Sequence, residues 1–349
     1  MSVHRSRIAP LIAAPLAVAL ATVSFVESAT AGGCGCVPIS IPVGEQFKAH
    51  TPGHLAFGYG YSFSDTDHYY IGTERDDATE TNVAPSTKGQ DHTLSVEYDL
   101  PKRFTLVGEI PIVSTAQKRE FGGVKGTMEA SGLGDLRLMA RYWVKDSGPR
   151  FRMHTALGLR FPTGEADGTF QAQNGTMVDK DVAAQAGTGN TAGLFEFGGS
   201  SAISPRLGLS FAGRYLFTPS AEAKSKNFRN QLTGNGPKMN SDNDAATLHL
   251  NAAFPLGTGE SALRKFALQG NVDFLWIPVD DLIGDSNGFR RAGKLFFAGP
   301  GLAWEPVPQL SVSTSVPFAL YRDIQKNGGN VQEWSFLFAI NFDALPGSY

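Results

Sequence analysis

Apolar and polar residues alternate with a period of two along most of the chain after Leu55. In the segment 136–144, for example, every even-numbered residue is apolar, whereas the odd-numbered positions include Arg137 and Arg141. Successive side chains of a β-strand point to opposite faces, so this period predicts strands with one apolar and one polar face. Helical periodicity is almost absent from the same region.

Twelve segments show this alternation. They lie near residues 54–72, 90–100, 103–120, 131–144, 150–164, 193–204, 207–222, 242–256, 265–280, 293–307, 310–324 and 331–343. The tenth segment is the weakest, because Gly299, Pro300 and Gly301 interrupt it. Many segments have about ten residues or more, the length that a tilted strand needs to cross a bilayer.

The connections between these segments alternate in length. The short ones lie near 100–103, 145–149, 204–207, 256–265 and 307–310. The long ones lie near 72–90, 115–131, 163–193, 220–242, 280–293 and 324–331. Short turns at one end and long loops at the other are typical of outer-membrane barrels. The pattern therefore predicts an all-β protein, a transmembrane antiparallel up-and-down β-barrel of about 12 strands with short periplasmic turns and long extracellular loops.

A secreted β-sandwich is the alternative fold, because its strands also alternate. Strands of a soluble sandwich are usually shorter, with about five or six residues. In a membrane the sheet must close, because an open edge leaves backbone N–H and C=O groups unpaired in lipid. The apolar face then points outward to lipid and the polar face lines the lumen.

The N-terminus has the organisation of a secretory signal peptide. His4, Arg5 and Arg7 precede a run of 19 uncharged residues from Ile8 to Val26. Ala29-Thr30-Ala31 follows as a small-x-small cleavage pattern. Pro10 and Pro15, with the alanine-rich composition, argue against a transmembrane anchor. We expect four regions, namely a signal peptide at 1–31, a periplasmic tail or plug at 32–53, the barrel at 54–343 and a C-terminal tail at 344–349.

Composition agrees with export to the bacterial outer membrane. Charged residues make up only 18 % of the chain, and the formal net charge is −3, which argues against a basic nucleic-acid-binding surface. The mean hydropathy of −0.14 excludes a bundle of apolar membrane helices. The expected partners are outer-membrane lipid and a small-molecule solute, with no nucleic acid.

Charged residues at the inward positions are the main candidates for function. The alternation points the following ionisable side chains into the lumen: Glu97, Asp99, Glu109, Asp135, Arg137, Arg141, Arg152, His154, Arg160, Glu196, Arg214, His249, Lys265 and Asp273. Two interpretations stay open: opposed charges that select polar solutes, or a network of ion pairs that fills a narrow barrel.

Apolar inward positions suggest a second kind of path. The alternation also points Met139, Trp143 and Leu275 inward, where they would form a patch for an apolar solute. The candidates for the solute path are Glu97, Glu109, Asp135, Arg137, Met139, Arg141, Trp143, Arg152, Arg160 and Asp273. Two mechanisms remain open, a water-filled pore and a lateral route through a strand weakened at Gly299, Pro300 and Gly301.

Catalysis and cofactors receive little support. On the expected strands, none of His92, His154 and His249 is followed two residues later by serine, and the usual hydrolase and phosphate-binding motifs are missing. We therefore expect neither enzyme activity nor a cofactor. Cys34 and Cys36 are weak metal candidates and would otherwise form a strained, reducible disulfide. The tail that carries them is also a candidate for binding a periplasmic partner.

Acidic loop residues form a further weak metal candidate. Asp242, Asn243 and Asp244, together with Asp280, Asp281 and Asp285, have the oxygen ligands that calcium prefers. No complete twelve-residue ligand loop is present, so solvated loop carboxylates are the simpler interpretation.

Three short motifs carry a family resemblance. They are Ser131-Gly132-Leu133-Gly134-Asp135-Leu136-Arg137-Leu138 with Ala140-Arg141-Tyr142, the segment Phe104 to Pro111, and Leu157-Gly158-Leu159-Arg160-Phe161-Pro162-Thr163-Gly164. They resemble an outer-membrane barrel family named after the meta-pathway of phenol degradation and likened to FadL-type transporters. The resemblance implies uptake of small hydrophobic or aromatic compounds. Alternatives are a scaffold barrel for a periplasmic or surface complex and an outer-membrane enzyme.

Overall fold

A computed structural model describes residues 50–77, 86–121, 124–148, 150–181, 184–220, 244–257, 261–283 and 292–345. The expected signal peptide, residues 32–49 of the expected tail and residues 346–349 lie outside these ranges. Within them, no helix is both long and apolar enough to cross a membrane.

The wall of the fold consists of long antiparallel strands. In chain order these are β1 (Leu55–Thr66), β4 (Ser86–Leu100), β5 (Phe104–Phe121), β7 (Leu136–Asp146), β8 (Arg152–Phe161), β11 (Ala192–Ser204), β12 (Leu207–Phe217), β13 (Ala245–Pro255), β14 (Phe266–Ile277), β15 (Gly293–Val307), β16 (Leu310–Ser315), β17 (Phe318–Val331) and β18 (Trp334–Leu345). The smaller elements are β2 (His68–Gly72), β3 (Glu74–Arg75), β6 (Val124–Leu133), β9 (Thr169–Gln171), β10 (Met177–Asp179) and the 3₁₀ helix η3 (Ala262–Lys265).

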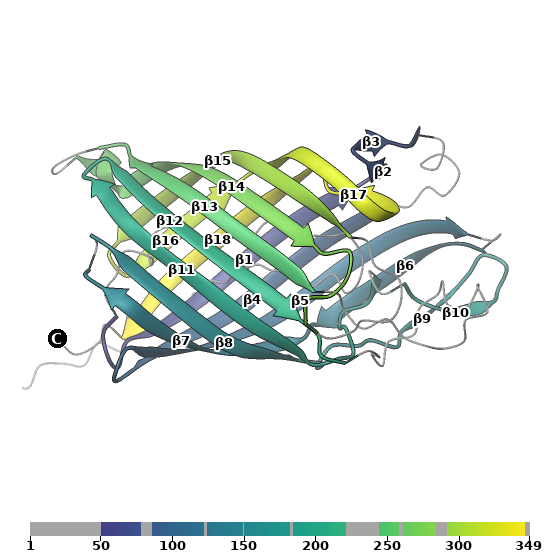
Figure 1. The fold of residues 1–349 in the computed structure, drawn as a ribbon, viewed down its shortest axis with the longest axis horizontal. Helices are drawn as coiled ribbons and strands as arrows, with labels where there is room; N and C mark the ends of the chain where they lie inside the picture. The colour runs from purple at the N-terminus through teal and green to yellow at the C-terminus, as the bar shows by residue number, and fades with distance from the viewer. Residues whose placement is uncertain are drawn as a thin grey trace, which may run out of the picture.

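The sheet closes on itself, as Figure 1 shows. Each wall strand pairs with its neighbours in chain order, and β1 pairs with β18 from Leu55 opposite Leu345 to Asp65 opposite Trp334. Because β16 and β17 follow one another along β15, they form one strand position, and the barrel has twelve. The predicted all-β barrel is confirmed.

The connections separate the two ends of the barrel. Short turns, such as those after Leu100 and Ser204, lie at one end, and the long connections lie at the other (Figure 1). We call these the periplasmic and extracellular ends, following the arrangement of outer-membrane barrels.

The alternation sorts the side chains as expected. On β7, Arg137 is 1 % exposed, whereas its neighbour Leu138 is 49 % exposed and faces outward. On β8, Leu157 is 67 % exposed between inward positions. Lys265 does not follow the expectation, because it lies exposed in η3 at a periplasmic turn, where its Nζ donates to the Pro306 carbonyl at 2.6 Å.

The expected long loop at 115–131 is wrong. The ladder of β5 continues to Phe121 and returns as β6, with Phe121 opposite Val124 and Ile112 opposite Leu133. This β5–β6 arm extends beyond the barrel at the extracellular end (Figure 1). The short hairpin of β9 and β10 packs against the arm through Met128, Phe170 and Val178. The expected fourth strand at 131–144 therefore begins only at Leu136.

The wall changes partners where β16 ends. Between β15 and the β16–β17 position, the paired residues stop at Gly301 opposite Ser315 and resume at Ala298 opposite Phe318. Pro300 and Pro317 lie in this break, and neither has a backbone N–H to donate. One bond remains, from the Val316 N–H to the Pro300 carbonyl at 3.1 Å.

Candidate solute pathway inside the barrel

One wall of the lumen carries a network of buried ion pairs. Arg214 on β12 reaches Glu109 on β5 at 3.1 Å, although β7, β8 and β11 lie between the two strands in the sheet. Glu109 also pairs with Arg137 at 3.1 Å. Because these side chains are 2 % exposed or less, the pairs link distant strands across the inside of the barrel.

Glu196 on β11 is the centre of the same network. Its carboxylate accepts from Arg214 Nη2 at 2.9 Å, from Arg141 Nη2 at 3.4 Å and from His154 Nε2 at 3.2 Å. Arg141 also reaches Glu97 on β4 at 2.9 Å. The acids predicted to face the bases therefore touch them directly. This geometry favours a space-filling network over two separate rows of charge along an open pore.

Met139 and Trp143 lie within this charged wall. The Met139 sulfur is 3.9 Å from Arg214 Nη2. The Trp143 ring lies 3.8 Å from the Arg152 guanidinium carbon, and its indole N–H donates to Thr105 at 3.0 Å. Arg152 pairs with Asp146 at 3.2 Å near the periplasmic end.

Asp135 and Arg160 hold the β8–β11 connection against the inner side of the wall. Asp135 is fully buried, and its carboxylate accepts from Gly164 N at 3.1 Å, Thr188 N at 2.9 Å and the Thr188 hydroxyl at 2.5 Å. Arg160 donates to Asn190 at 3.2 Å. Two residues of the charged wall thus anchor an extracellular loop, a role that the alternation pattern does not reveal.

The opposite wall is polar but carries almost no charge. On β13 and β14, His249 pairs with Asp273 at 2.6 Å, and the Asn251 amide donates to Asn271 at 2.6 Å. Asp273 thus lies apart from the other nine predicted path residues. Several buried polar atoms of this wall have no hydrogen-bond partner in the described part of the chain: Gln269 Nε2, Asn271 Nδ2, His249 Nε2, Asp273 Oδ2, Ser311 Oγ and Asn341 Oδ1. Each such atom costs about 1–3 kcal/mol unless water or a solute satisfies it.

An apolar cluster lies inside the barrel toward its extracellular end. Its members are Tyr70, Leu275, Ile277, Leu295, Phe297, Ile324 and Val331. Leu275 and Leu295 are direct cross-strand partners, and both are buried. The predicted patch of Met139, Trp143 and Leu275 is therefore wrong, because only Leu275 belongs to this cluster. The other members lie on strand ends that come together only in the closed barrel.

Residues before β1 lie across part of the periplasmic mouth. The His50 N–H donates to Asp146 at 2.9 Å, and the Thr51 N–H donates to Asp99 at 3.0 Å. His54 Nε2 lies 3.2 Å from Asp343 at the end of β18. These contacts tie the last part of the expected tail or plug to the rim. A periplasmic partner for the tail stays a prediction.

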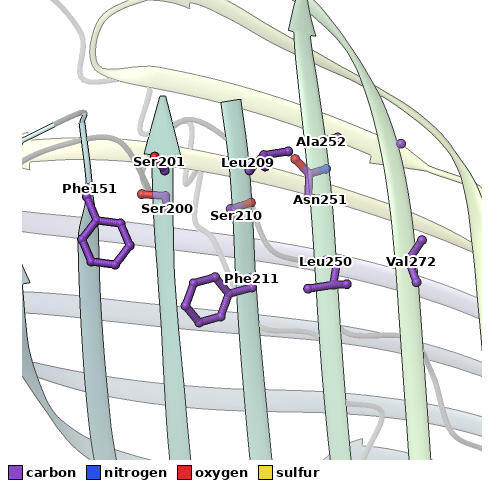
Figure 2. A pocket seen from close by; sticks show the side chains of 11 residues that line it. Phe151, Ser200, Ser201, Leu209, Ser210, Phe211, Leu250, Asn251, Ala252 and Val272 are labelled. Atoms are coloured by element: carbon purple, nitrogen blue, oxygen red, sulfur yellow. The ribbon is translucent and has the colours of Figure 1, made fainter. Parts of the chain in front are cut away.

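An apolar groove of about 420 Å³ lies on the outside of the wall (Figure 2). Phe151, Leu209 and Leu250 line it and are each about two-fifths exposed. Because these side chains belong to the outward face, the groove is separate from the lumen.

The metal candidates gain no support. Cys34, Cys36, Asp242, Asn243 and Asp285 lie outside the described residues. Asp244 accepts hydrogen bonds from the Tyr215 hydroxyl and from Leu282 N at 2.8 Å and Ile283 N at 2.9 Å. Its carboxylate thus holds a turn. Among the described residues there is no group of three or more metal-binding side chains.

Known proteins resemble this chain in fold but not in sequence. No family model and no curated protein matches the chain, so the family resemblance of the three motifs stays a prediction. The crystal structure of the COG4313 outer membrane channel from Pseudomonas putida F1 is similar, with a TM-score of 0.60, 12 % identity, and coverage of 87 % of this chain and 100 % of that chain.

Two further solved structures align with lower scores. The CymD monoaromatic hydrocarbon channel has a TM-score of 0.45 and 10 % identity, and the alignment covers 94 % of this chain and 100 % of that one. A Pseudomonas aeruginosa FadL homologue has a TM-score of 0.45 and 9 % identity, with coverage of 86 % and 96 %. The closed twelve-strand sheet and the similarity to the Pseudomonas putida F1 structure show the fold, which is that of outer-membrane β-barrels.

Proposed function

We propose that the protein is an outer-membrane channel for small, largely apolar molecules. The observation that carries this proposal is the apolar cluster inside the barrel. The interior of an outer-membrane barrel is normally polar, since its apolar residues face lipid. Leu275, Leu295 and Phe297 depart from this rule at the end where a solute would enter from outside.

The two walls divide the lumen into a closed and a more open side. The network around Glu196 fills one side with mutually paired charges. On the other side, the apolar cluster is followed toward the periplasmic end by the His249–Asp273 pair and then by amides. A solute path along β13, β14 and β15 therefore leaves the arginine–glutamate network intact, whose disruption would strongly destabilise the protein.

The fold neighbour supports this class of function. The structure from Pseudomonas putida F1 that shares the fold is described as an outer membrane channel. The buried paired charges of the lumen each contact an oppositely charged side chain. Their presence is therefore explained by the fold and does not require a catalytic role.

The wall has one candidate exit close to the apolar cluster. Phe297 lies opposite Ala319, and the break at Pro300 and Pro317 comes next toward the periplasmic end. A lateral exit through this break would release an apolar solute without crossing the periplasmic mouth, where residues 50–54 lie.

Uptake by intact cells tests the proposal. Gram-negative cells with complete lipopolysaccharide, with and without the protein, receive radiolabelled toluene, and the initial rate is measured. We expect faster uptake with the protein and a several-fold lower rate with Leu275→Gln. The matched control is Leu194→Gln, because Leu194 is also buried but lies in an apolar cluster on the charged wall.

Two outcomes of the uptake measurement would contradict the proposal. Each variant is first shown to be folded by its heat-modifiable electrophoretic mobility. If uptake of toluene with folded wild-type protein equals that of the empty vector, the proposed function is wrong. If both variants reduce uptake equally, the apolar cluster is not the path.

A further inference from the structure

The inward residues of β13, β14 and β15 form rows that change in polarity along the barrel. Leu275 lies opposite Leu295, and Asp273 lies between His249 and Phe297. Toward the periplasmic end, Asn271 lies opposite Gly299, and the next inward residue of β14, Gln269, lies opposite Gly301. Along a single strand the lining thus changes from apolar to a His–Asp pair and then to amides.

The polar rows contain donors and an acceptor that no described residue satisfies. His249 Nε2, Asp273 Oδ2, Asn271 Nδ2 and Gln269 Nε2 all lack a hydrogen-bond partner in the described ranges. The four side chains are between 2 % and 7 % exposed. Buried polar groups in proteins nearly always have a partner, so these atoms indicate a position for something that the chain itself does not supply.

The neighbouring glycine makes room for the amides. A Cβ atom at Gly301 would lie 2.9 Å from Asn271 Nδ2 and 3.0 Å from Gln269 Oε1. Any other residue at this inward position would displace both amides. Their arrangement side by side therefore depends on the absence of a side chain on β15.

The local charge balance indicates a neutral ligand. His249 and Asp273 are the ionisable residues at the buried inward positions of these three strands, and they pair with each other at 2.6 Å. The nearest arginine on the adjacent strand, Arg322 opposite Leu295, is paired with Glu333 at 2.7 Å. At the buried inward positions of the described part of these three strands, no arginine or lysine is available to pair with a carboxylate.

We propose that Asn271, Gln269 and the His249–Asp273 pair form the polar half of a solute site whose apolar half is Leu275, Leu295 and Phe297. The ligand class is a small uncharged molecule with an apolar body and one hydroxyl or carbonyl oxygen. Residues two apart on a strand are about 7 Å apart, so one ring spans from the Leu275 row to the Asp273 row. This inference rests on the proposed function and narrows its substrate class.

The site is covered by its own side chains in this structure. Phe297 is 1 % exposed and lies opposite Asp273. A solute therefore reaches the amides by displacing this ring, and its oxygen then takes the hydrogen bonds that the chain leaves unmade.

Three probes of similar size separate the possible ligand classes. They are 3-fluorotoluene, 3-fluorobenzyl alcohol and 3-fluorobenzoate, measured by fluorine NMR with the full mature protein in lipid nanodiscs. Empty nanodiscs provide the correction for partitioning into lipid. We expect the alcohol to bind about tenfold more tightly than the toluene, because it completes buried hydrogen bonds.

Substitutions in the polar rows test whether these residues cause the preference for the alcohol over the toluene. Asn271→Leu should weaken alcohol binding and bring the alcohol-to-toluene ratio to about one, and Gln269→Leu is the second variant if the first does not fold. The matched control is Asn341→Leu on β18, which removes another buried amide with an unpartnered oxygen and should leave the ratio unchanged.

The outcomes distinguish this inference from the proposed function. Equal binding of alcohol and toluene, an equal effect of Asn341→Leu, or tightest binding of benzoate would each overturn the neutral-oxygen site. In those cases, toluene uptake that depends on Leu275 would still support the channel. Absence of both binding and uptake for all probes would instead refute the channel proposal itself.

Discussion

Replacing Asp135 by asparagine should release the β8–β11 connection from the inside of the barrel. The two carboxylate oxygens of Asp135 accept three hydrogen bonds from this connection, one from Gly164 and two from Thr188. An asparagine side chain has the same shape but presents an NH₂ group in place of one oxygen. At least one N–H or O–H of the loop then faces a donor and loses its partner.

The size of the effect follows from these bonds. A hydrogen bond to a charged group contributes about 1.5–3 kcal/mol. Every 1.4 kcal/mol changes an equilibrium tenfold. Loss of a single bond should therefore raise the population of the released loop by at least about tenfold, and loss of both Thr188 bonds by more.

Single-channel recording in planar bilayers measures this change. We expect Asp135→Asn to increase the fraction of time in the highest conductance state. The matched control is Glu165→Gln, which removes one carboxylate charge from the exposed surface of the same connection. If Asp135→Asn and wild type have the same conductance distribution, with folding of both shown, the loop that Asp135 holds inside the barrel does not limit the conductance.

Three further changes test other parts of the structure. Glu196→Gln should lower the free energy of unfolding by about 3–5 kcal/mol, because it removes the buried carboxylate that Arg214 and Arg141 share; urea unfolding in lipid vesicles measures this, and an unchanged midpoint would show that this carboxylate is dispensable. Phe297→Ala should raise the toluene uptake rate while costing about 3–5 kcal/mol of stability, and slower uptake by folded protein would contradict a blocking role for the ring. His54→Ala removes the contact to Asp343 and should speed hydrogen exchange of residues 50–53, whereas unchanged exchange would mean that the other contacts suffice.

The period of two was enough to predict the barrel and the direction of most side chains. It depends only on the local geometry of a strand, so Arg137 and Leu138 could be assigned to opposite faces without knowing their neighbours. Counting the alternating segments predicted the strand number, and the connection lengths distinguished the two ends of the barrel. The same reasoning failed for residues 115–131, because this hairpin extends beyond the barrel and its buried residue Met128 packs against the β9–β10 hairpin, a contact that no local pattern reveals.

Contacts between residues on opposite sides of the lumen could not be predicted from the sequence. Arg214 meets Glu109 because β12 lies opposite β5 once the sheet has closed, and no pattern along the chain encodes that distance. The apolar cluster likewise joins Leu275 to Tyr70, more than 200 positions away in the chain, and separates it from Met139. The sequence of a strand determines whether a residue faces the lumen or the lipid. The closure of the barrel and the register of its strands determine which residues then come into contact across the lumen, and the candidate site depends on these contacts.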